Sequence, residues 1–373
     1  MPDRHGTDAA QAAAAGPGSA APAPRIEFTF RWWGPQDPVP LAAFGQVPNV
    51  DTVVTSLGEV PVGEPWSAAA IAERQDLCAA AGLEWTVVES VGVHEAIKLA
   101  APERDRYIDA YAVTLERLGA AGVRTVCYNF MPVFDWMRTD FDYRLPDGSR
   151  VTSYSQSDLD AIDLSRGLPR LPAWPQAYTA AELGALFERY AGVSDEEFLA
   201  RYRYFVERVV PVAEGAGVRL AVHPDDPPWR LFGLPRIAKT AADLAALLAC
   251  SDSPAHGLTF CTGSLGARGD ADLPAMARRF AGRTHFVHLR NVRRRGPRDF
   301  HEVDHTRGAG DVDLVEVMAA LLEGGFAGPL RPDHGRMIWG EEGVPGYGLY
   351  DRSLGLMYLQ GVHDALTREG AGS

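Results

Sequence analysis

The chain has 373 residues, of which 46% are hydrophobic and 23% are charged, so it can bury a large core and is not disordered as a whole. Its formal net charge of −13 argues against a nucleic-acid partner, because that kind of binding depends on clustered cations. No stretch has the length and apolarity of a membrane span, and we expect a cytoplasmic protein without a membrane partner.

The first 24 residues are predicted to be a disordered tail. They are rich in Ala, Pro and Gly and lack the strong apolar segment of a signal peptide. Residues 25–373 are predicted to form a single domain, since α/β barrels often exceed the usual length of one domain.

Eight short segments behind the tail read as strands, and several are continuous apolar runs, as expected for strands covered on both faces. Amphipathic segments of helical length lie between them, and several end at a glycine. The predicted strands are Ile26 to Trp32, Thr52 to Leu57, Glu84 to Ser90, Arg124 to Phe130, Val218 to His223, Leu258 to Thr262, Thr284 to Leu289 and Leu330 to Asp333. The predicted helices are Ala68 to Ala81, Arg104 to Ala121, Asp195 to Gly215, Ala241 to Cys250, Asp272 to Phe280 and Asp313 to Gly324.

Alternating strands and helices of this number predict a (β/α)8 TIM barrel. A long insertion, at about residues 134–194, follows the fourth strand and is rich in Asp, Pro, Tyr and Trp. Excursions of this kind after a barrel strand are commonly lids or oligomer contacts. The basic run Arg293 to Arg295 is interpreted as a solvated loop.

The four strands of the second half each carry one metal-competent side chain at the C-terminal end. These side chains are His223, Cys261, His288 and Asp333. Because adjacent parallel strands end on the same rim of a barrel, we expect the four to converge near the barrel axis. Two imidazoles, a thiolate and a carboxylate suit Mn²⁺, Fe²⁺, Co²⁺ or Zn²⁺. The other cysteines, Cys78, Cys127 and Cys250, are interpreted as buried hydrophobic residues.

A second metal motif competes with this site. His301, Glu302 and His305 spell the H-E-x-x-H pattern of zinc proteases, which needs a helix to place both histidines on one face. The segment is short and runs into a Gly-rich turn, so we expect His301 and His305 to line a loop above the rim instead. No P-loop, dinucleotide fingerprint or serine nucleophile elbow is present.

Long blocks of the chain resemble the mannonate dehydratase family, from about Arg25 to Asp364. These blocks are FRWWGPQD, VPVGEPW, ESVGVHEAIKL, CYNFMPVFDWMRTDF, HPDDPP, CTGSLGA, HLRNV, GPLRPDHGR and PGYGLYDRSLGLMYL. The resemblance implies a barrel enzyme that dehydrates D-mannonate to 2-dehydro-3-deoxy-D-gluconate with Mn²⁺ or a related divalent ion. It also implies that His223, Cys261, His288 and Asp333 bind the metal and that His334 and Tyr347 transfer protons.

The expected reaction needs a base, an acid for the departing hydroxyl, and positive charge against the enediolate. Tyr347 lies in a Gly-rich segment after the last strand and could act as acid or base, with His334 beside a metal ligand sharing that role. A sugar-acid substrate also calls for cations and amides near the strand ends. The predicted substrate-binding residues are Arg336, which we favour, and Arg290, Arg31, Asn129 and Asn291.

Two other readings stay open at this point. One is a divalent-metal sugar isomerase or epimerase of the xylose-isomerase kind, although such sites are usually rich in carboxylates. The other is a non-catalytic sugar-acid binding barrel. We expect a homo-oligomer, with a dimer as the commonest symmetric form.

Overall fold

The computed structural model describes residues 25–163 and 179–369. The predicted tail, residues 1–24, lies outside the described residues, as does the part of the predicted insertion at residues 164–178.

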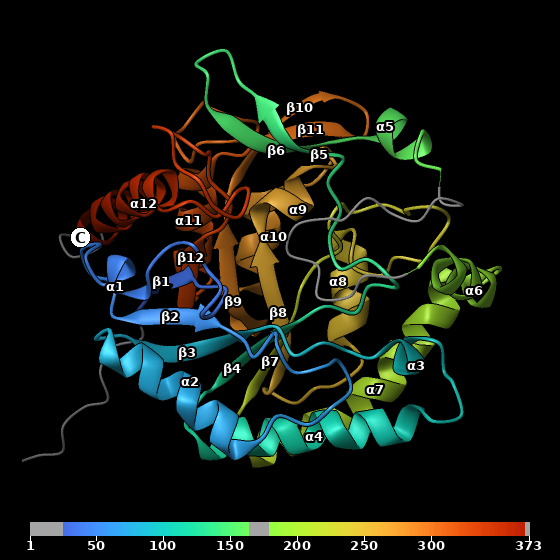
Figure 1. Ribbon diagram of the computed structural model, residues 1–373. Helices are drawn as coiled ribbons and strands as arrows, with labels where there is room; N and C mark the ends of the chain where they lie inside the picture. Colours follow the sequence, from blue (N-terminus) through green and yellow to red (C-terminus); the bar gives the residue numbers. More distant parts are fainter. Residues whose placement is uncertain (1–24, 164–178, 370–373) are drawn as a thin grey trace, which may run out of the picture.

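Eight parallel strands close into a barrel, so the predicted (β/α)8 fold is confirmed (Figure 1). The ring runs in the order β1, β12, β9, β8, β7, β4, β3, β2 and returns to β1. All eight predicted strands are present, with ends displaced by no more than three residues. Their bounds are β1 Glu27–Arg31, β2 Thr52–Thr55, β3 Glu84–Glu89, β4 Thr125–Tyr128, β7 Arg219–Val222, β8 His256–Cys261, β9 Thr284–Leu289 and β12 Pro329–Pro332.

The inside of the barrel is a packed apolar layer rather than a channel. It is made by one buried side chain from each of five strands, which are Val54, Val87, Cys127, Ala221 and Phe286. Side chains of alternate residues point to the barrel interior, so this layer supports the polar side chains at the next inward positions along the strands. This apolar layer therefore lies beneath any site at the strand ends.

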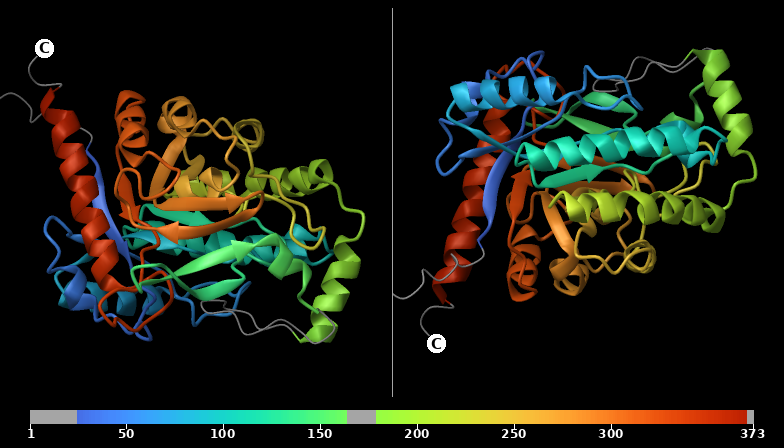
Figure 2. Two further views of the ribbon diagram at one scale, coloured as in Figure 1. Left: turned by 90° about the horizontal axis from the view of Figure 1, so that it is seen from above. Right: turned by 90° about the horizontal axis from the view of Figure 1, so that it is seen from below.

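Helices cover the outside of the barrel, and the six predicted helices are all present. Figure 2 shows α4 and α7 side by side against the barrel strands. α7 begins after Ser194, whose hydroxyl accepts a hydrogen bond from the backbone N–H of Glu197 at 3.0 Å. The helices are α1 Leu41–Phe44, α2 Ala68–Ala80, α3 Glu95–Lys98, α4 Arg104–Ala120, α5 Gln156–Asp160, α6 Ala180–Tyr190, α7 Asp195–Gly215, α8 Ala241–Leu248, α9 Thr262–Gly266, α10 Leu273–Phe280, α11 Leu314–Glu323, α12 Leu349–Glu369 and the 3₁₀ turn η2 Ala281–Arg283.

The last helix, α12, is missing from the sequence prediction. Its apolar and polar residues are poorly segregated, and it contains Gly355 and Gly361, which disfavour a helix on propensity alone. Gly355 is needed because a Cβ at that position would collide with the ring of buried His305. Tertiary packing, rather than local helix propensity, thus determines that this segment is helical.

An accessory sheet of four strands lies beside one end of the barrel, with the order β10, β11, β6, β5 (Figure 1). β5 Asp140–Arg144 and β6 Arg150–Ser155 come from the insertion after β4, whereas β10 Asn291–Gly296 and β11 Asp299–Val303 follow β9. The expectation of a solvated loop at Arg293 to Arg295 is therefore wrong, since these residues form an edge strand. Charged side chains on an edge strand discourage pairing with other chains.

None of the described helices combines the length and the apolar composition that a bilayer crossing requires.

Buried His285 in β9 predicts a loss of stability in mild acid. Burial, with smaller contributions from Arg219, Arg283 and His256, lowers the pKa of His285 to about 4, against about 6.5 in the unfolded chain. The unfolded chain therefore binds the proton more readily, so stability is full above pH 6.5 and falls as the pH drops toward 4. The expected loss from this group is about 3 kcal/mol.

The variant His285→Gln tests this expectation, because glutamine can still donate to the Leu220 carbonyl that His285 Nδ1 contacts at 2.9 Å. Chemical unfolding of both proteins between pH 7.5 and 4.5 should give a flatter pH dependence for the variant. Equal slopes would show that His285 is not an important acid-sensitive group.

Candidate active site

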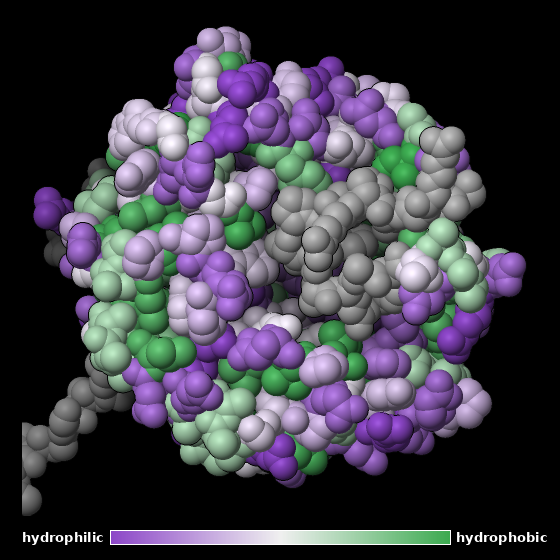
Figure 3. Space-filling view, viewed as in Figure 1, coloured by the Kyte–Doolittle hydropathy of each residue, from purple (hydrophilic) through white to green (hydrophobic). Residues whose placement is uncertain are grey.

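A cavity of about 500 Å³ opens at the C-terminal ends of the barrel strands. The space-filling view of this face shows hydrophobic residues gathered over α12 and α1 (Figure 3). Apolar and polar side chains both line the cavity. Its charged and amide lining includes Arg31, Glu59, Glu89, Lys98, Asn129, His223, Asp226, Arg290, Arg331, Asp333 and His334.

The four side chains predicted to bind metal come together at the strand ends, where His223 and Asp333 line the cavity and Cys261 and His288 are buried beside them. Ligand atoms of His223, Cys261 and His288 all lie within 4.8 Å of one another. Asp333 Oδ2 lies 3.8 Å from Cys261 Sγ and 3.9 Å from His288 Nδ1. The residues end or follow β7, β8, β9 and β12, which are consecutive in the ring, so the barrel closure itself gathers them.

The two imidazoles are held with nitrogens facing each other. His223 Nδ1 lies 2.7 Å from the carbonyl oxygen of Pro224, which can only accept a hydrogen bond. Nδ1 therefore carries the proton and Nε2 carries the lone pair, which faces His288 Nδ1 at 3.2 Å. Burial lowers the pKa of His223, which favours its neutral form. A neutral imidazole with an exposed lone pair is the form that binds a cation.

Arg331 joins the two carboxylates of the site, Asp333 and Glu89. Its guanidinium contacts Glu89 through two hydrogen bonds of 2.8 and 3.0 Å and lies 2.5 Å from Asp333 Oδ1. Burial opposes ionisation of both carboxyls, but the charge of Arg331 outweighs it and holds both pKa values well below their usual range. Both groups are therefore anionic at neutral pH.

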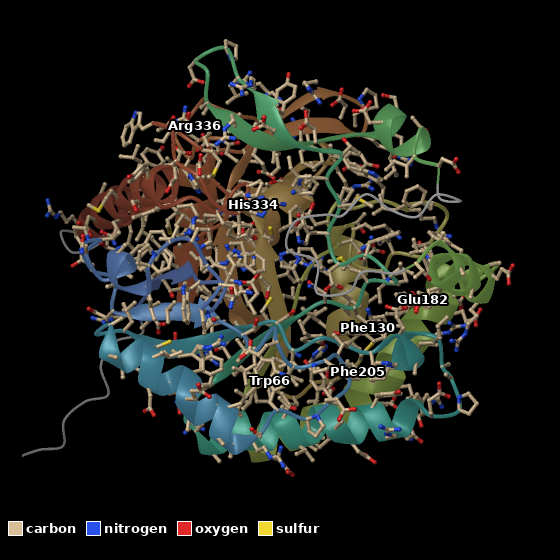
Figure 4. The ribbon with its side chains drawn as sticks, viewed as in Figure 1. Trp66, Phe130, Glu182, Phe205, His334 and Arg336 are labelled. Carbon is tan, nitrogen blue, oxygen red and sulfur yellow. The ribbon has the colours of Figure 1, made fainter. Side chains whose placement is uncertain are left out.

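His334 and Tyr347 form a hydrogen-bonded pair on the cavity wall, and Figure 4 places His334 near the middle of this face. The distance from His334 Nε2 to Tyr347 Oη is 3.0 Å. Burial and the nearby charge of Asp333 raise the pKa of Tyr347, so its phenol is protonated at neutral pH. The pair can hold and pass a proton beside the four candidate ligands.

The predicted substrate-binding residues divide into two groups. Arg31, Arg290 and Asn129 line the cavity. Arg336 and Asn291 are not among the described residues that line it.

Contacts with other residues explain where the side chains of Arg336 and Asn291 lie. Arg336 ion-pairs with Asp351 of α12 at 2.8 Å and with Asp147 at 3.0 Å, and Figure 4 shows it farther out than His334. Asn291 is buried, and its Oδ1 accepts the backbone N–H of Val312 at 3.0 Å. Both residues hold secondary-structure elements together.

The H-E-x-x-H segment is a strand and not a helix, so the zinc-protease arrangement is excluded. His301 and Glu302 lie in β11, which also corrects the expectation that His301 lines a loop. His305 follows the strand, is buried, and has Nε2 3.0 Å from the carbonyl oxygen of Leu289.

Sequence reasoning missed four charged residues of the site, which are Glu89, Arg331, Asp226 and Glu302. Glu89 ends its strand on the same rim as the four ligands, so the strand-end rule could have found it. Arg331 sits inside an apolar run, and Asp226 follows a predicted ligand in the block HPDDPP. Glu302 was not identified as a residue of the site because its segment was interpreted as a loop.

The chain was compared with known proteins. Residues 26–371 match the family model described as D-mannonate dehydratase (UxuA). Mannonate dehydratase 2 of Halalkalibacterium halodurans is 46% identical over 344 residues, which cover 92% of this chain and 100% of that protein. A mannonate dehydratase of Thermotoga neapolitana is 45% identical, with 92% of this chain and 98% of that protein covered.

Solved structures give the same fold. The crystal structure of mannonate dehydratase from Streptococcus suis serotype 2 superposes with a TM-score of 0.86 at 40% identity, covering 94% of this chain and 95% of that one. A xylose isomerase-like TIM barrel protein from Mycobacterium smegmatis, in complex with magnesium, reaches a TM-score of 0.52 at 14% identity, with 87% of each chain covered. The second likeness shows the barrel fold alone.

Proposed function

This chain belongs to the D-mannonate dehydratase family, and on that premise we propose that it is a hydro-lyase converting D-mannonate to 2-dehydro-3-deoxy-D-gluconate and water. One observation carries the proposal: two imidazoles, a thiol and a carboxylate cluster at the strand ends, and two of them, His223 and Asp333, line the same cavity as a hydrogen-bonded histidine–tyrosine pair. The first group can bind a Lewis acid and the second can move a proton, which are the two requirements of the reaction.

We assign His223, Cys261, His288 and Asp333 as ligands of a divalent cation, with Mn²⁺ first and Fe²⁺, Co²⁺ or Zn²⁺ as alternatives. The donors fit such an ion, because Nε2 of His223 carries a lone pair and lies close to a second imidazole, a thiol and a carboxylate. When bound, the ion would polarise substrate oxygens and stabilise the negative charge of the enediolate.

His334 and Tyr347 are assigned to proton transfer. One group removes the proton from C2, beside the substrate carboxylate, and a proton is delivered to the C3 hydroxyl, which leaves as water. The resulting enol tautomerises to the 2-keto acid, so the substrate loses one water in total. The raised pKa of Tyr347 suits a phenol that delivers its proton and recovers it within one turnover.

Arg31 is assigned to the substrate carboxylate. Among the described residues, its guanidinium donates to the Trp32 carbonyl at 2.8 Å, has a long contact of 3.5 Å to Ser56 Oγ, and lies over the Trp33 ring at 4.4 Å from the centroid. By contrast, Arg290 and Arg331 each make close contacts to two carboxylates. Arg31 therefore keeps donors available for an anionic ligand, while Asn129 and Arg290 complete the wall that faces the sugar hydroxyls.

The variant Arg31→Gln should raise KM for the aldonate roughly 10- to 100-fold, the loss expected for a hydrogen bond to a charged group. Steady-state kinetics of the purified protein measures this, and Arg106→Gln on the surface of α4 is the matched control. An unchanged KM in the Arg31 variant would place the carboxylate elsewhere.

Turnover on a panel of aldonates, after chelation and reconstitution with each divalent ion, tests the whole proposal. Loss of one water, read by mass spectrometry, is the expected result. A product with the mass of the substrate would instead favour an isomerase or epimerase, and binding without conversion would favour a non-catalytic sugar-acid protein.

We further propose that the protein works as a cytoplasmic homodimer. The mass of the particle in solution, measured by light scattering after size-exclusion chromatography, tests the dimer. Fractionation of cells that produce the chain tests its location.

A further inference from the structure

Glu302 is a buried carboxylate that the proposed chemistry does not use. It lies in β11, the inner strand of the accessory sheet, and its side chain is 1% exposed. Arg138 Nη2 donates to its Oε1 at 2.9 Å, and Arg290 Nη1 lies 3.3 Å from the same oxygen. Burial opposes its ionisation, but Arg290, with smaller contributions from His334 and Arg138, outweighs burial and lowers the pKa of Glu302 to about 2. The group is a fixed anion.

The same oxygen of Glu302 contacts the proton-transfer pair. Glu302 Oε1 lies 3.0 Å from His334 Nδ1, and the other ring nitrogen, Nε2, lies 3.0 Å from Tyr347 Oη. The three side chains form one line of contacts from the accessory sheet to the cavity wall. Since an ionised carboxylate only accepts hydrogen bonds, a proton on Nδ1 would leave the lone pair of Nε2 facing the phenol.

We infer that Glu302 is a positioning residue for the proposed reaction, which holds His334 with its proton on Nδ1 and directs Nε2 to the hydroxyl of Tyr347. The inference rests on the proposed function for its catalytic meaning. In this arrangement Tyr347 donates to His334, and the accessory sheet supplies a group that the barrel alone does not.

A competing arrangement must be weighed, because Arg290 Nη1 also lies 2.9 Å from His334 Nδ1. If the guanidinium donated to Nδ1, the proton would sit on Nε2 and Tyr347 would accept it. The contacts favour the first arrangement. Arg290 donates to Asp226 at 2.6 Å and to Ser264 at 3.2 Å through Nη2, and its Nη1 can donate to Glu302 Oε1 at 3.3 Å, so Arg290 does not depend on Nδ1 as an acceptor. Glu302 in turn needs donors to compensate its buried charge.

The variant Glu302→Gln tests the inference, because glutamine keeps the size of the side chain and removes its charge. We expect kcat to fall roughly 100-fold or more, as for other carboxylates that orient a catalytic or metal-bound histidine, while KM changes little. Glu302→Asp should recover part of the loss. Asp299→Asn is the control, since Asp299 lies in the same strand but pairs with Arg295 near the surface.

A second readout does not depend on turnover. Nitrogen-15 NMR of the full chain, labelled at histidine and loaded with diamagnetic Zn²⁺, reports which ring nitrogen of His334 carries the proton, and His334→Asn identifies the signal. We expect Nδ1–H in the unchanged protein and a shift toward Nε2–H in Glu302→Gln. A proton on Nε2 in the unchanged protein, or the same tautomer and kcat within about twofold in the variant, would overturn the inference. If the unchanged protein dehydrates no aldonate, the proposed function fails, and the NMR result still decides the role of Glu302.

Discussion

Replacing Tyr347 with Phe is expected to abolish turnover while leaving the bound metal unchanged. The substitution removes a single hydroxyl, which contacts His334 Nε2 at 3.0 Å, and keeps the ring that packs edge-on against Trp33 at 4.9 Å between centroids. Groups that transfer protons in a transition state commonly contribute about 10²- to 10⁴-fold. A fall in kcat within this range, with normal metal content, is the expected result.

The control for this prediction is Tyr350→Phe. Tyr350 lies three residues along the chain in α12, is 44% exposed, and is not among the residues that line the cavity. Rates of 2-keto acid formation and metal content by elemental analysis should be measured on both variants. Retained turnover in Tyr347→Phe would remove this residue from the mechanism, and simultaneous loss of metal would give it a structural role instead.

Replacing Cys261 with Ala should remove the ion and, with it, activity at low metal concentration. Cys261 is fully buried at the end of β8, and Ser264 Oγ donates to its sulfur at 3.2 Å. Loss of an outer partner of a metal ligand already costs roughly 10- to 100-fold in affinity, so loss of a direct ligand should cost at least about 100-fold. Titration with Mn²⁺ or Zn²⁺ measures the affinity, and a large excess of metal should restore part of the activity.

Cys250→Ala is the matched control, because Cys250 is half-buried just beyond α8 and is also a free thiol. Its metal affinity should equal that of the unchanged protein. Stoichiometric, tight metal in Cys261→Ala would show that sulfur is not a ligand and would leave only His223, His288 and Asp333 to hold the ion.

The barrel and its candidate ligands were predictable because they depend on short-range signals. Runs such as those of β8 and β9 are continuously apolar, and a soft or charged residue at the end of such a run stands out. Parallel strands then bring those ends together without further information. That rule led to His223, Cys261, His288 and Asp333, and the structure brings all four together.

The accessory sheet was not predictable by the same signals. β10 and β11 carry arginines, a histidine and carboxylates, so neither is an apolar run, and the pairing of β11 with β6 joins segments more than 140 residues apart. Long-range pairing leaves little trace in one sequence. For this reason the sequence did not show that Glu302 lies in a strand.

The preference for Arg336 as a substrate ligand rested on its place just past a strand end, which does not fix the direction of its side chain. An arginine just past a strand end has a long side chain that can turn into the cavity or away from it. Here the buried carboxylate of Asp351, on the unpredicted helix α12, draws it outward through contacts of 2.8 Å to the guanidinium and the backbone. Because α12 was not predicted, the sequence did not show that Asp351 competes for that arginine.

The position of β12 in the ring has a consequence for how the ion and the fold depend on each other. β12 lies between β9 and β1 in the ring, and its pairing with β1 joins the last barrel strand to the first. Asp333 follows β12 directly. The pairing of β12 that closes the barrel therefore also brings Asp333, the fourth candidate ligand, to the site. Binding of a cation to the proposed site and closure of the barrel should therefore be thermodynamically linked, so that each favours the other. Divalent ions should raise the melting temperature of the whole barrel and not only order its rim.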